Sequence, residues 1–415
     1  MSKNCFVEGQ YYSINKLKES GLSQRIIDIY TSENGRGFKF SFCGFLSSGD
    51  EFFVVLPKEQ SIPNSLTALA TKAGLLAQTF RRYSSENNLD EEELRLLGKS
   101  GSQHSNRIAT ALSLLDDYNR NGLLIRDRTV ESNSGQGKIH WGRTINKHLP
   151  VYQDGAPFYF DTITRNHSRD SKDMIVLLHR YAIQKCRSTF GWILSPHFES
   201  TKTVVPSMPC SDSGALHILR NELDNSFRDR DISVINLLIS YFSNAASEAD
   251  KTTICAYGTK KFYHIWEAVC CTLFNHDRSQ MKLVPRPKWV RIVDGVQKIE
   301  ETVQIPDILF VEKNIRYILD AKYYTHSRSL PGWGDLVKQF YYADTIATDD
   351  VKSVRNAMIF PGRHVQLMKY IGYGEIQNRE NKPILAFSLN LFSALKSYTA
   401  FSSNGYRNTL ETLWQ

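Results

Sequence analysis

The sequence has no uninterrupted apolar stretch of the length that a membrane-spanning helix needs, about 18 residues or more. Its first residues, MSKNCFVEGQYYS, lack the long apolar core of a secretory signal. We therefore expect a cytoplasmic protein that does not bind membranes. The chain has 415 residues, 41% hydrophobic and 23% charged, which is typical of a soluble protein with two or three domains.

Paired cysteines are also absent. The seven cysteines are scattered, none forms a CxxC pair, and the adjacent Cys270 and Cys271 would point to different sides of a helix or strand. We expect buried free thiols rather than a zinc site or a disulfide framework. The segment around His264 has no second histidine at ligand spacing, which disfavours a histidine-based zinc site there.

A complete phosphate-binding loop is missing as well. Gly98, Lys99 and Ser100 resemble the end of such a loop, but Glu93 stands where its first glycine is required, and an acidic helical stretch precedes it. We expect no nucleotide to bind to this chain alone. The net charge of +8 indicates a polyanionic partner, although charge by itself leaves that question open.

The order of predicted elements divides the chain into four segments. Residues 1–85 are expected to form a β-rich region, 86–165 a winged-helix-like module that binds DNA or a partner, 166–250 a helical connector, and 251–415 an α/β domain. The connector rests on apolar residues at helical spacing over 172–193, followed by a polar break and two further helices. The fold class is therefore a multidomain α+β protein.

One predicted hairpin carries ionisable residues in an unfavourable arrangement. Apolar runs at 305–311 and 315–323 are separated by a short polar stretch. If Lys313 and Asn314 form a two-residue turn, Asp307 falls directly opposite Asp320, where like charges are destabilising. Lys322 projects on the same face as Asp320. For so short a motif, an ion pair at the surface is the simpler interpretation.

The surrounding sequence favours a second interpretation. Both runs are nearly continuous and apolar, as interior strands covered on both faces would be. Carboxylates at the ends of such strands are costly without a compensating cation. Converging carboxylates suit Mg²⁺, and a neighbouring ammonium can stabilise charge that develops on a phosphate. We therefore expect a hard-cation site at Asp307 and Asp320.

Pro306-Asp307, followed after twelve residues by Asp320-Ala321-Lys322, resembles the PD-(D/E)xK motif of restriction-type and repair nucleases. The resemblance implies that Asp307, Asp320 and the Ala321 carbonyl hold Mg²⁺, or Mn²⁺ in its place, while Lys322 positions or activates the attacking water. In these nucleases a helix before the catalytic strands often adds a glutamate to the metal site. Glu267 matches that role in position and type; a place at the edge of its helix is the alternative.

Residues after the motif supply further candidates. The stretch 334–346 is predicted to be helical, and Gln339 with Tyr342 resembles the Q-x-x-Y-type helix that braces the active site in some branches of the superfamily. Gln339 would support the site or contact DNA, with simple packing as the alternative. His326 and Arg328 follow Lys322 where a DNA backbone would pass, and they would equally suit an ordinary surface.

A wider resemblance is to the McrC and LlaJI-type restriction proteins, over roughly residues 110–190 and 255–365. It is carried by a G-x-I-x-W-x-x-T core at 137–144, then F-x-x-x-W-E, P-D and D-A-K-Y. The family implies an endonuclease of double-stranded DNA in a phage-defence system, licensed by a separate AAA+ GTPase of the McrB type. Lys138, His140, Trp141 and Arg143 are the candidates for a partner or DNA interface; a hydrophobic anchor and solvated loop charges are the alternatives.

Two other functions stay open on the sequence. The chain would be a non-catalytic scaffold if its nuclease-like domain bound DNA or stimulated a GTPase without cutting. It would be a self-sufficient homodimeric type II restriction enzyme if it read its own DNA site and cut without nucleotide.

Overall fold

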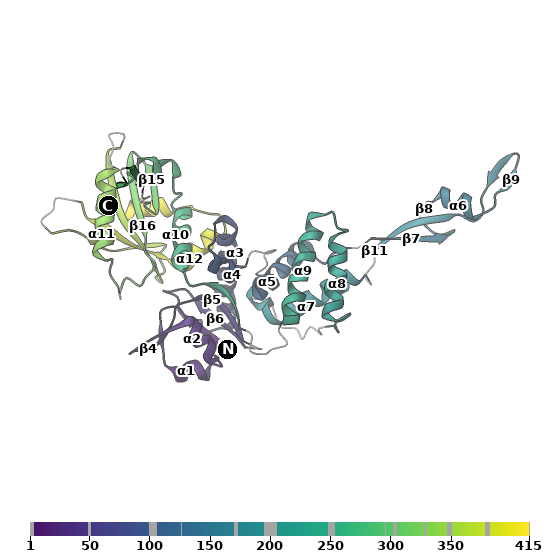
Figure 1. Cartoon of the computed structure of the whole chain (residues 1–415), viewed down its shortest axis with the longest axis horizontal. Helices are drawn as coiled ribbons and strands as arrows, with labels where there is room; N and C mark the ends of the chain where they lie inside the picture. The colour runs from purple at the N-terminus through teal and green to yellow at the C-terminus, as the bar shows by residue number, and fades with distance from the viewer. Residues whose placement is uncertain are drawn as a thin grey trace. The chain divides into compact units, whose positions relative to one another are not determined.

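The computed structural model describes residues 4–48, 51–98, 106–125, 127–169, 173–194, 206–247, 254–294, 296–301, 305–327, 329–346, 351–377 and 382–414. The chain forms two compact units (Figure 1). Unit 1 comprises residues 1–109, 192–198 and 250–415, and unit 2 comprises residues 110–191 and 199–249. The N-terminal segment and the C-terminal domain, which the sequence analysis kept apart, thus belong to one unit. Within the described ranges, no helix has the length and apolar character to cross a membrane.

The N-terminal part of unit 1 combines two small sheets with helices. Its strands are β1 (Cys5–Val7), β2 (Tyr11–Tyr12), β3 (Thr31–Asn34), β4 (Gly37–Phe40), β5 (Cys43–Ser48) and β6 (Glu51–Leu56), and its helices are α1 (Ile14–Glu19), α2 (Gln24–Tyr30), α3 (Leu66–Glu86) and α4 (Glu91–Leu97). One sheet has the order β2-β4-β3 and the other the order β1-β6-β5-β12. Strand β12 (Ile254–Thr259) pairs antiparallel with β5, so residues far apart in sequence complete one sheet.

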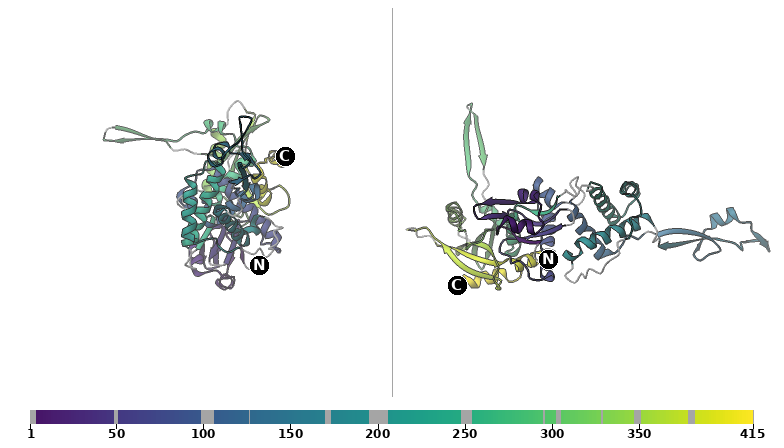
Figure 2. Two further views of the ribbon diagram at one scale, coloured as in Figure 1. Left: turned by 90° about the vertical axis from the view of Figure 1, so that its right-hand side faces the viewer. Right: turned by 90° about the horizontal axis from the view of Figure 1, so that it is seen from below.

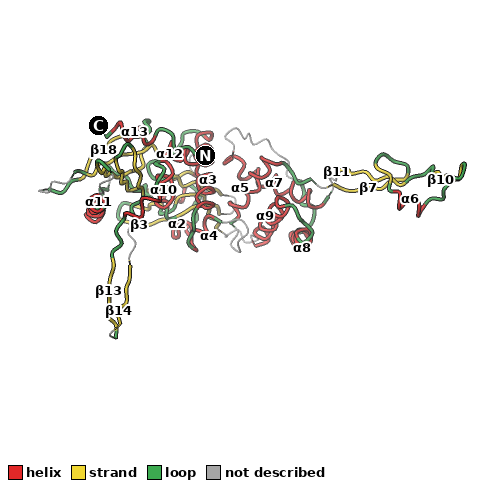
Figure 3. Tube along the Cα trace, turned by 90° about the horizontal axis from the view of Figure 1, so that it is seen from above, coloured by secondary structure: helices red, strands yellow, loops and turns green. Residues whose placement is uncertain are grey.

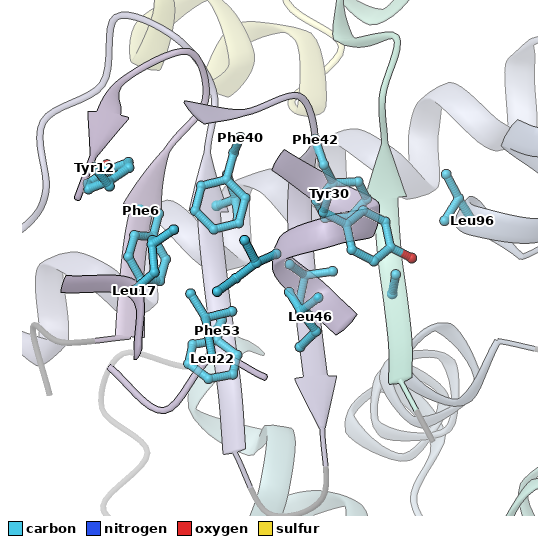
Figure 4. Packing of buried hydrophobic residues seen from close by; sticks show 14 residues of the cluster. Phe6, Tyr12, Leu17, Leu22, Tyr30, Phe40, Phe42, Leu46, Phe53 and Leu96 are labelled. Carbon is cyan, nitrogen blue, oxygen red and sulfur yellow. The ribbon is translucent and has the colours of Figure 1, made fainter. Parts of the chain in front are cut away.

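Aromatic side chains form the core of this part. Phe6, Phe40, Phe42 and Phe53 are almost completely buried in one cluster (Figure 4), and the ring centroids of Phe6 and Phe40 lie 4.9 Å apart. The region is less purely β than expected, because α3 runs for 21 residues behind its N-cap Ser65. Its buried residues recur at helical spacing, which is the amphipathic pattern of a helix packed on a sheet.

The C-terminal part of unit 1 is built on a five-stranded sheet of order β15-β16-β17-β19-β18 (Figure 1). Its strands are β15 (Ile308–Glu312), β16 (Ile315–Ala321), β17 (Ser353–Gly362), β18 (Met368–Gly374) and β19 (Ile384–Asn390), and its helices are α10 (Phe262–Leu273), the 3₁₀ helix η2 (Arg278–Leu283), α11 (Trp333–Thr345), α12 (Leu391–Thr399) and α13 (Tyr406–Leu413). The three central strands β16, β17 and β19 are parallel, and both edge strands are antiparallel to their neighbours.

Helices cover both faces of this sheet. On one face, Leu309 and Ile318 pack against Tyr342 of α11. Because side chains alternate along a strand, Phe310 and Tyr317 point to the other face, where Phe310 stacks on Phe274 at the C-terminal end of α10. Residues Asp307, Asp320 and Lys322 share the parity of Leu309 and Ile318, so they belong to the α11 face.

Strand β15 lies at the edge of the sheet, so the expectation that both hairpin strands are interior is wrong for this one. Its outer side is nevertheless covered. The backbone N–H of Asp277 donates to the Leu309 carbonyl at 2.7 Å, and the Leu309 N–H donates to His276 Nδ1 at 3.0 Å. This loop takes the place of a neighbouring strand, which explains how an edge strand can carry a buried apolar run.

A second hairpin, β13 (Lys288–Val293) and β14 (Val296–Glu301), stands apart from the sheets (Figures 2 and 3). Its described residues are all exposed. We call this hairpin the ribbon.

Unit 2 consists of helices and a small β region. It contains most of α5 (Arg107–Asn121), then β7 (Asp127–Asn133), β8 (Lys138–Ile139), α6 (Trp141–Lys147), β9 (Val151–Gln153), β10 (Ala156–Phe158), β11 (Ile163–Arg169), most of α7 (Met174–Leu194), α8 (Asp212–Leu223) and α9 (Asp229–Ser247). Strands β7, β11 and β8 form one sheet, and β9 and β10 form a hairpin. The predicted helix over 172–193 and the two helices after it are confirmed.

Buried and half-buried polar contacts connect the elements of unit 2. The Leu124 N–H donates to Nδ1 of the fully buried His179 at 3.2 Å, and burial lowers the pKa of His179 to about 4. The imidazole is therefore neutral and can accept this bond. Arg230 donates to the Asp117 carboxylate at 3.1 Å and to the Gly122 carbonyl at 2.6 Å. Across the chain all seven cysteines are free, as predicted; four are buried and three are half-buried.

Candidate active site

The β15–β16 hairpin has the register that the sequence predicts. Lys313 and Asn314 form its turn with φ of 50° and 63°, as a two-residue type I′ turn requires. Ile308 pairs with Leu319, and the register holds through to the pair of Glu312 and Ile315. Continued by one residue, it places Asp307 opposite Asp320, at the end of the hairpin away from the turn.

The two carboxylates lie close enough for the charge of Asp320 to affect the pKa of Asp307. Asp307 Oδ2 accepts a hydrogen bond from the Ala321 N–H at 2.7 Å, which ties the start of β15 to the end of β16. Burial, and after it the charge of Asp320, raise the pKa of Asp307 well above its usual range. The electrostatic strain inferred from the sequence is therefore present in the fold.

Lys322 is held between two carboxylates. Its Nζ lies 2.7 Å from Asp320 Oδ2 and 2.9 Å from Asp335 Oδ1. Burial acts to lower the pKa of Lys322, but the two carboxylates outweigh it and raise the pKa above its ordinary value. Lys322 is thus an ammonium at neutral pH, able to donate hydrogen bonds and to neutralise charge but not to accept a proton.

Asp335 is the member of this cluster that sequence reasoning missed. It lies in the first turn of α11, and its Oδ2 accepts from the Gly332 N–H at 3.2 Å while its Oδ1 binds Lys322. The ion pair with Lys322 lowers the pKa of Asp335 even though burial acts in the opposite direction. The sequence showed Asp335 and Gln339 one helical turn apart, but it could not show that α11 lies over this end of β16.

Glu267 approaches from α10. That helix is fixed by buried apolar residues, and the Trp266 Nε1–H donates to the Ile359 carbonyl at 3.3 Å. Ile359 is the β17 residue paired with Ala321, so α10 is anchored beside the end of β16. Burial, followed by the charges of Asp307 and Asp320, raises the pKa of Glu267 to about 7. Glu267 therefore shares one electrostatic environment with both aspartates.

Two residues of α11 lie behind the cluster. Tyr342 is buried, and burial followed by the charges of Asp320 and Asp307 raises the pKa of its hydroxyl. Gln339 is 1% exposed, and within the described part of the chain neither end of its side-chain amide has a hydrogen-bond partner. Its backbone carbonyl accepts from Asn356 Nδ2 at 2.7 Å, which holds α11 to β17.

Tyr323, directly after Lys322, anchors this strand end to the N-terminal part of unit 1. Its hydroxyl donates to Glu8 Oε2 at 2.6 Å and accepts from the Lys58 N–H at 2.8 Å. The Lys58 ammonium also lies 4.6 Å from the centroid of the Tyr323 ring, in cation–π contact. These contacts of Tyr323 with the N-terminal part of unit 1 restrain the backbone next to Lys322.

Comparison with known proteins gives this arrangement a context. The model of the LlaJI restriction endonuclease family matches residues 42–391. The chain belongs to the LlaJI restriction endonuclease family. It is also 28% identical over 382 residues to a Bacillus subtilis (strain 168) protein named Type II restriction enzyme BsuMI component YdjA, covering 88% of this chain and 81% of that protein. This LlaJI-family chain is therefore a nuclease of a restriction system.

The residues of this LlaJI-family site suit a hard cation in their chemistry. Carboxylate and backbone carbonyl oxygens are the donors that Mg²⁺ prefers. Burial, followed by the charges of neighbouring carboxylates, raises the pKa values of Glu267 and Asp307, and a bound cation would offset both effects. Among the described residues, no three His, Cys, Asp or Glu side chains are already gathered at metal-ligand spacing. The donor atoms therefore match the ion in chemistry.

The other candidates lie around this cluster or in unit 2. His326 is half-buried, with its ring centroid 6.3 Å from that of Phe360; Arg328 lies outside the described residues. In unit 2, Lys138 belongs to the exposed strand β8, and His140 is the N-cap of α6, where its Nδ1 accepts from the Arg143 N–H at 3.2 Å.

Trp141 is the first residue of α6 and is 53% exposed. The Arg143 guanidinium pairs with Glu131. The candidates Lys138, His140, Trp141 and Arg143 therefore lie together on the β7–β11 region of unit 2, where Ile139 and Ile145 are also exposed.

Proposed function

We propose that this LlaJI-family member is the Mg²⁺-dependent endonuclease subunit of its restriction system, with a PD-(D/E)xK-type site that hydrolyses phosphodiesters of double-stranded DNA. The observation that carries the proposal is the pair of opposed aspartates at the buried end of β15 and β16, with the Lys322 ammonium 2.7 Å from Asp320. An arrangement that destabilises the empty fold but suits a cation and a phosphate is what such chemistry requires.

Each residue has a role that follows from its position. Glu267, Asp307, Asp320 and the Ala321 carbonyl would hold Mg²⁺, or Mn²⁺ in its place. When bound, the ion would lower the pKa of a coordinated water and polarise the phosphate. Lys322, which stays charged, would orient that water and stabilise negative charge on the phosphate as the bond from water to phosphorus forms and the bond to the leaving sugar oxygen breaks. Asp335 would keep the ammonium in place.

Gln339 and Tyr342 would support the site from behind. Gln339 is too deeply buried to meet DNA in this arrangement, which favours bracing over a direct contact. His326 and Arg328 would flank the path of the DNA backbone after Lys322, since they follow it in the chain.

A second protein would license cutting. The relative in Bacillus subtilis is named as a component of its restriction enzyme, which favours a system of more than one chain. We propose a McrB-like AAA+ GTPase, acting with this chain in the cytoplasm, and Lys138, His140, Trp141 and Arg143 as its docking surface or a DNA contact. The exposed apolar side chains around Trp141 support a protein partner there.

Incubation of the purified chain with plasmid DNA and Mg²⁺, with and without the co-expressed GTPase and GTP, tests this function. Cleavage that needs the partner and GTP and disappears in Lys322→Ala is the expected result. Cutting by the wild-type chain alone would instead indicate a self-sufficient type II enzyme. No cutting under any condition, on DNA of several sequences and methylation states, would indicate a non-catalytic scaffold and overturn the assignment.

A further inference from the structure

The ribbon combines strong exposure with an unusual charge arrangement. Trp289 is 69% exposed and Ile292 is 74% exposed. An isolated two-stranded ribbon is marginally stable in water. Because β13 and β14 pair in register from Lys288 and Glu301 to Val293 and Val296, Arg291 stands directly opposite Lys298. Like charges at directly opposed positions are destabilising. Of these two basic residues, Arg291 is the one that forms an ion pair with Glu300.

The chain that leads into the ribbon is basic as well. Residues 278–293 contain five lysines and arginines and no aspartate or glutamate. These five side chains are all exposed: Arg278, Lys282, Arg286, Lys288 and Arg291. Since the acidic residues of the ribbon lie at its turn and at the end of β14, the positive charge is concentrated on one strand and its stem.

Both ends of the ribbon are joined by short stretches of chain to residues of the candidate active site or of the core beneath it. On one side, Val284 packs in the cluster of Leu309, Ile318 and Tyr342, beneath the end of the hairpin that carries Asp307 and Asp320. On the other side, five residues lie between Glu301 and Asp307, so the two Cα atoms are at most about 20 Å apart. The ribbon is therefore tethered at both ends within a short chain distance of the carboxylates.

We propose that the ribbon lies in a groove of the DNA duplex and that its basic strand holds the phosphate backbone beside the cleavage site. This inference rests on the proposed nuclease function and assigns to the ribbon the binding of the DNA substrate. A two-stranded ribbon fits the major groove, which is about 12 Å wide. Phosphates neutralise the opposed Arg291 and Lys298, and Trp289, on the same face, packs against sugars or bases.

Salt dependence of DNA binding tests the proposal. A fluorescently labelled 30-base-pair duplex of arbitrary sequence is titrated in Ca²⁺, which stands in for Mg²⁺ to suppress cutting, over a range of KCl concentrations. Each phosphate contact contributes about 0.9 to the slope of log K against log salt. The double variant Arg291→Gln/Lys298→Gln is expected to lower that slope by about 1.8. Trp289→Ala is expected to weaken binding severalfold at every salt concentration with the slope unchanged.

Lys313→Gln/Lys396→Gln is the matched control, because it removes the same charge from exposed positions outside the ribbon. Its slope should equal that of the wild type. Thermal melting of both double variants should match the wild type, because the ribbon side chains and Lys396 are exposed and the ion pair of the exposed Lys313 with Glu411 contributes little to stability.

Three outcomes would overturn the proposal: an unchanged slope in Arg291→Gln/Lys298→Gln, an equal fall in the control, or no duplex binding by the wild type at low salt. A change of sedimentation coefficient in Trp289→Ala without any change in DNA affinity would identify the ribbon as a contact between copies of the chain. Duplex binding through the ribbon without Mg²⁺-dependent cutting would refute the nuclease function and leave the ribbon's role standing.

Discussion

The two hairpins of the C-terminal part of unit 1 follow one plan with opposite signs of charge. The β15–β16 hairpin turns at Lys313 and Asn314 and sets Asp307 against Asp320. The ribbon turns through Asp294, which also has positive φ, and sets Arg291 against Lys298. In each, a tight turn fixes the register, and the register brings like charges together at a cost to the isolated hairpin.

Burial separates the two. The acidic pair lies where low polarity strengthens repulsion, so the pKa values of neighbouring carboxylates rise and a compact cation is the natural compensation. The basic pair is exposed, where water already weakens repulsion, so an extended polyanion is the better match. The proposed metal site and the proposed DNA contact thus use the same arrangement of opposed like charges.

Of the substitutions considered, removal of the Lys322 side chain should have the largest effect on activity. Lys322→Ala is expected to lower cleavage about 10³-fold, since a half-buried cation next to the proposed position of the reacting phosphate is lost. Lys313→Ala, at the turn of the same hairpin and paired with Glu411, is the control and should cut at the wild-type rate. The measurement is single-turnover cleavage of plasmid DNA with the partner present. Equal rates in the two variants would show that the charged end of the hairpin has no special role.

The buried acids should make the metal-free protein lose stability as pH rises. Because the pKa of Glu267 is raised to about 7 in the fold, folded Glu267 keeps its proton at pH values where the unfolded chain has released it. Stability is then highest below the unfolded pKa and falls as pH rises toward 7. After allowance for screening of this partly exposed group, we expect a fall of about 2 kcal/mol.

Urea unfolding between pH 4.5 and 7.5 in EDTA measures that fall. Glu267→Gln should flatten the profile, whereas Glu300→Gln on the exposed ribbon should leave it unchanged. A wild-type profile that rises over this interval would contradict the assigned direction.

Asp335 should matter less than Lys322 but measurably. Asp335→Asn removes the charge that holds the ammonium, and changes to groups that orient a catalytic residue typically lower activity 10- to 100-fold; we expect about 10-fold. Asp335→Glu, which restores the charge on the same turn of α11, should recover part of the loss. If Asp335→Asn cuts like the wild type, Lys322 is positioned by Asp320 alone.

The smallest expected effect concerns the opposed aspartates themselves. Asp307→Asn keeps the shape and the hydrogen bond from the Ala321 N–H but removes one of the two charges. We expect the metal-free protein to gain about 1 kcal/mol and to lose the rise in melting temperature that the wild type shows with Mg²⁺ or Ca²⁺. Lys298→Gln, the matched change in the ribbon, should leave that rise intact. A metal-induced rise that persists in Asp307→Asn would remove Asp307 from the metal site.

The hairpin of the site could be read from the sequence because local chemistry determines it. A polar pair between two β-branched runs fixes a two-residue turn, and the turn fixes which residues face each other. The error about β15 has an equally local cause. A continuous apolar run indicates that both faces of a strand are covered, but not whether both of its edges pair with other strands. Here His276 and Asp277 make the hydrogen bonds to Leu309 that a neighbouring strand would otherwise make.

Contacts between distant segments were beyond the sequence. The link from Asp335 to Lys322 needs the placement of α11 over β16, and the link from Glu8 to Tyr323 joins residues 315 positions apart. The ribbon was within reach, since Asp294-Gly295 between two β-branched runs is a strong hairpin signal. That the ribbon stands apart from the other sheets could not be predicted, because a hairpin has the same local sequence pattern whether or not other elements cover it.

The anchoring of Tyr323 bears on how far this protein can be trimmed. A fragment cut at the boundary near residue 251 would contain all of the proposed metal ligands and would look like a minimal nuclease. It would also discard Glu8 and Lys58, which hold the hydroxyl and ring of Tyr323, and β5, which pairs with β12. The residue next to Lys322 would then lose its support, and a buried aromatic surface would open to water. The first sixty residues thus support the strand end that carries Lys322, although none of them belongs to the proposed site.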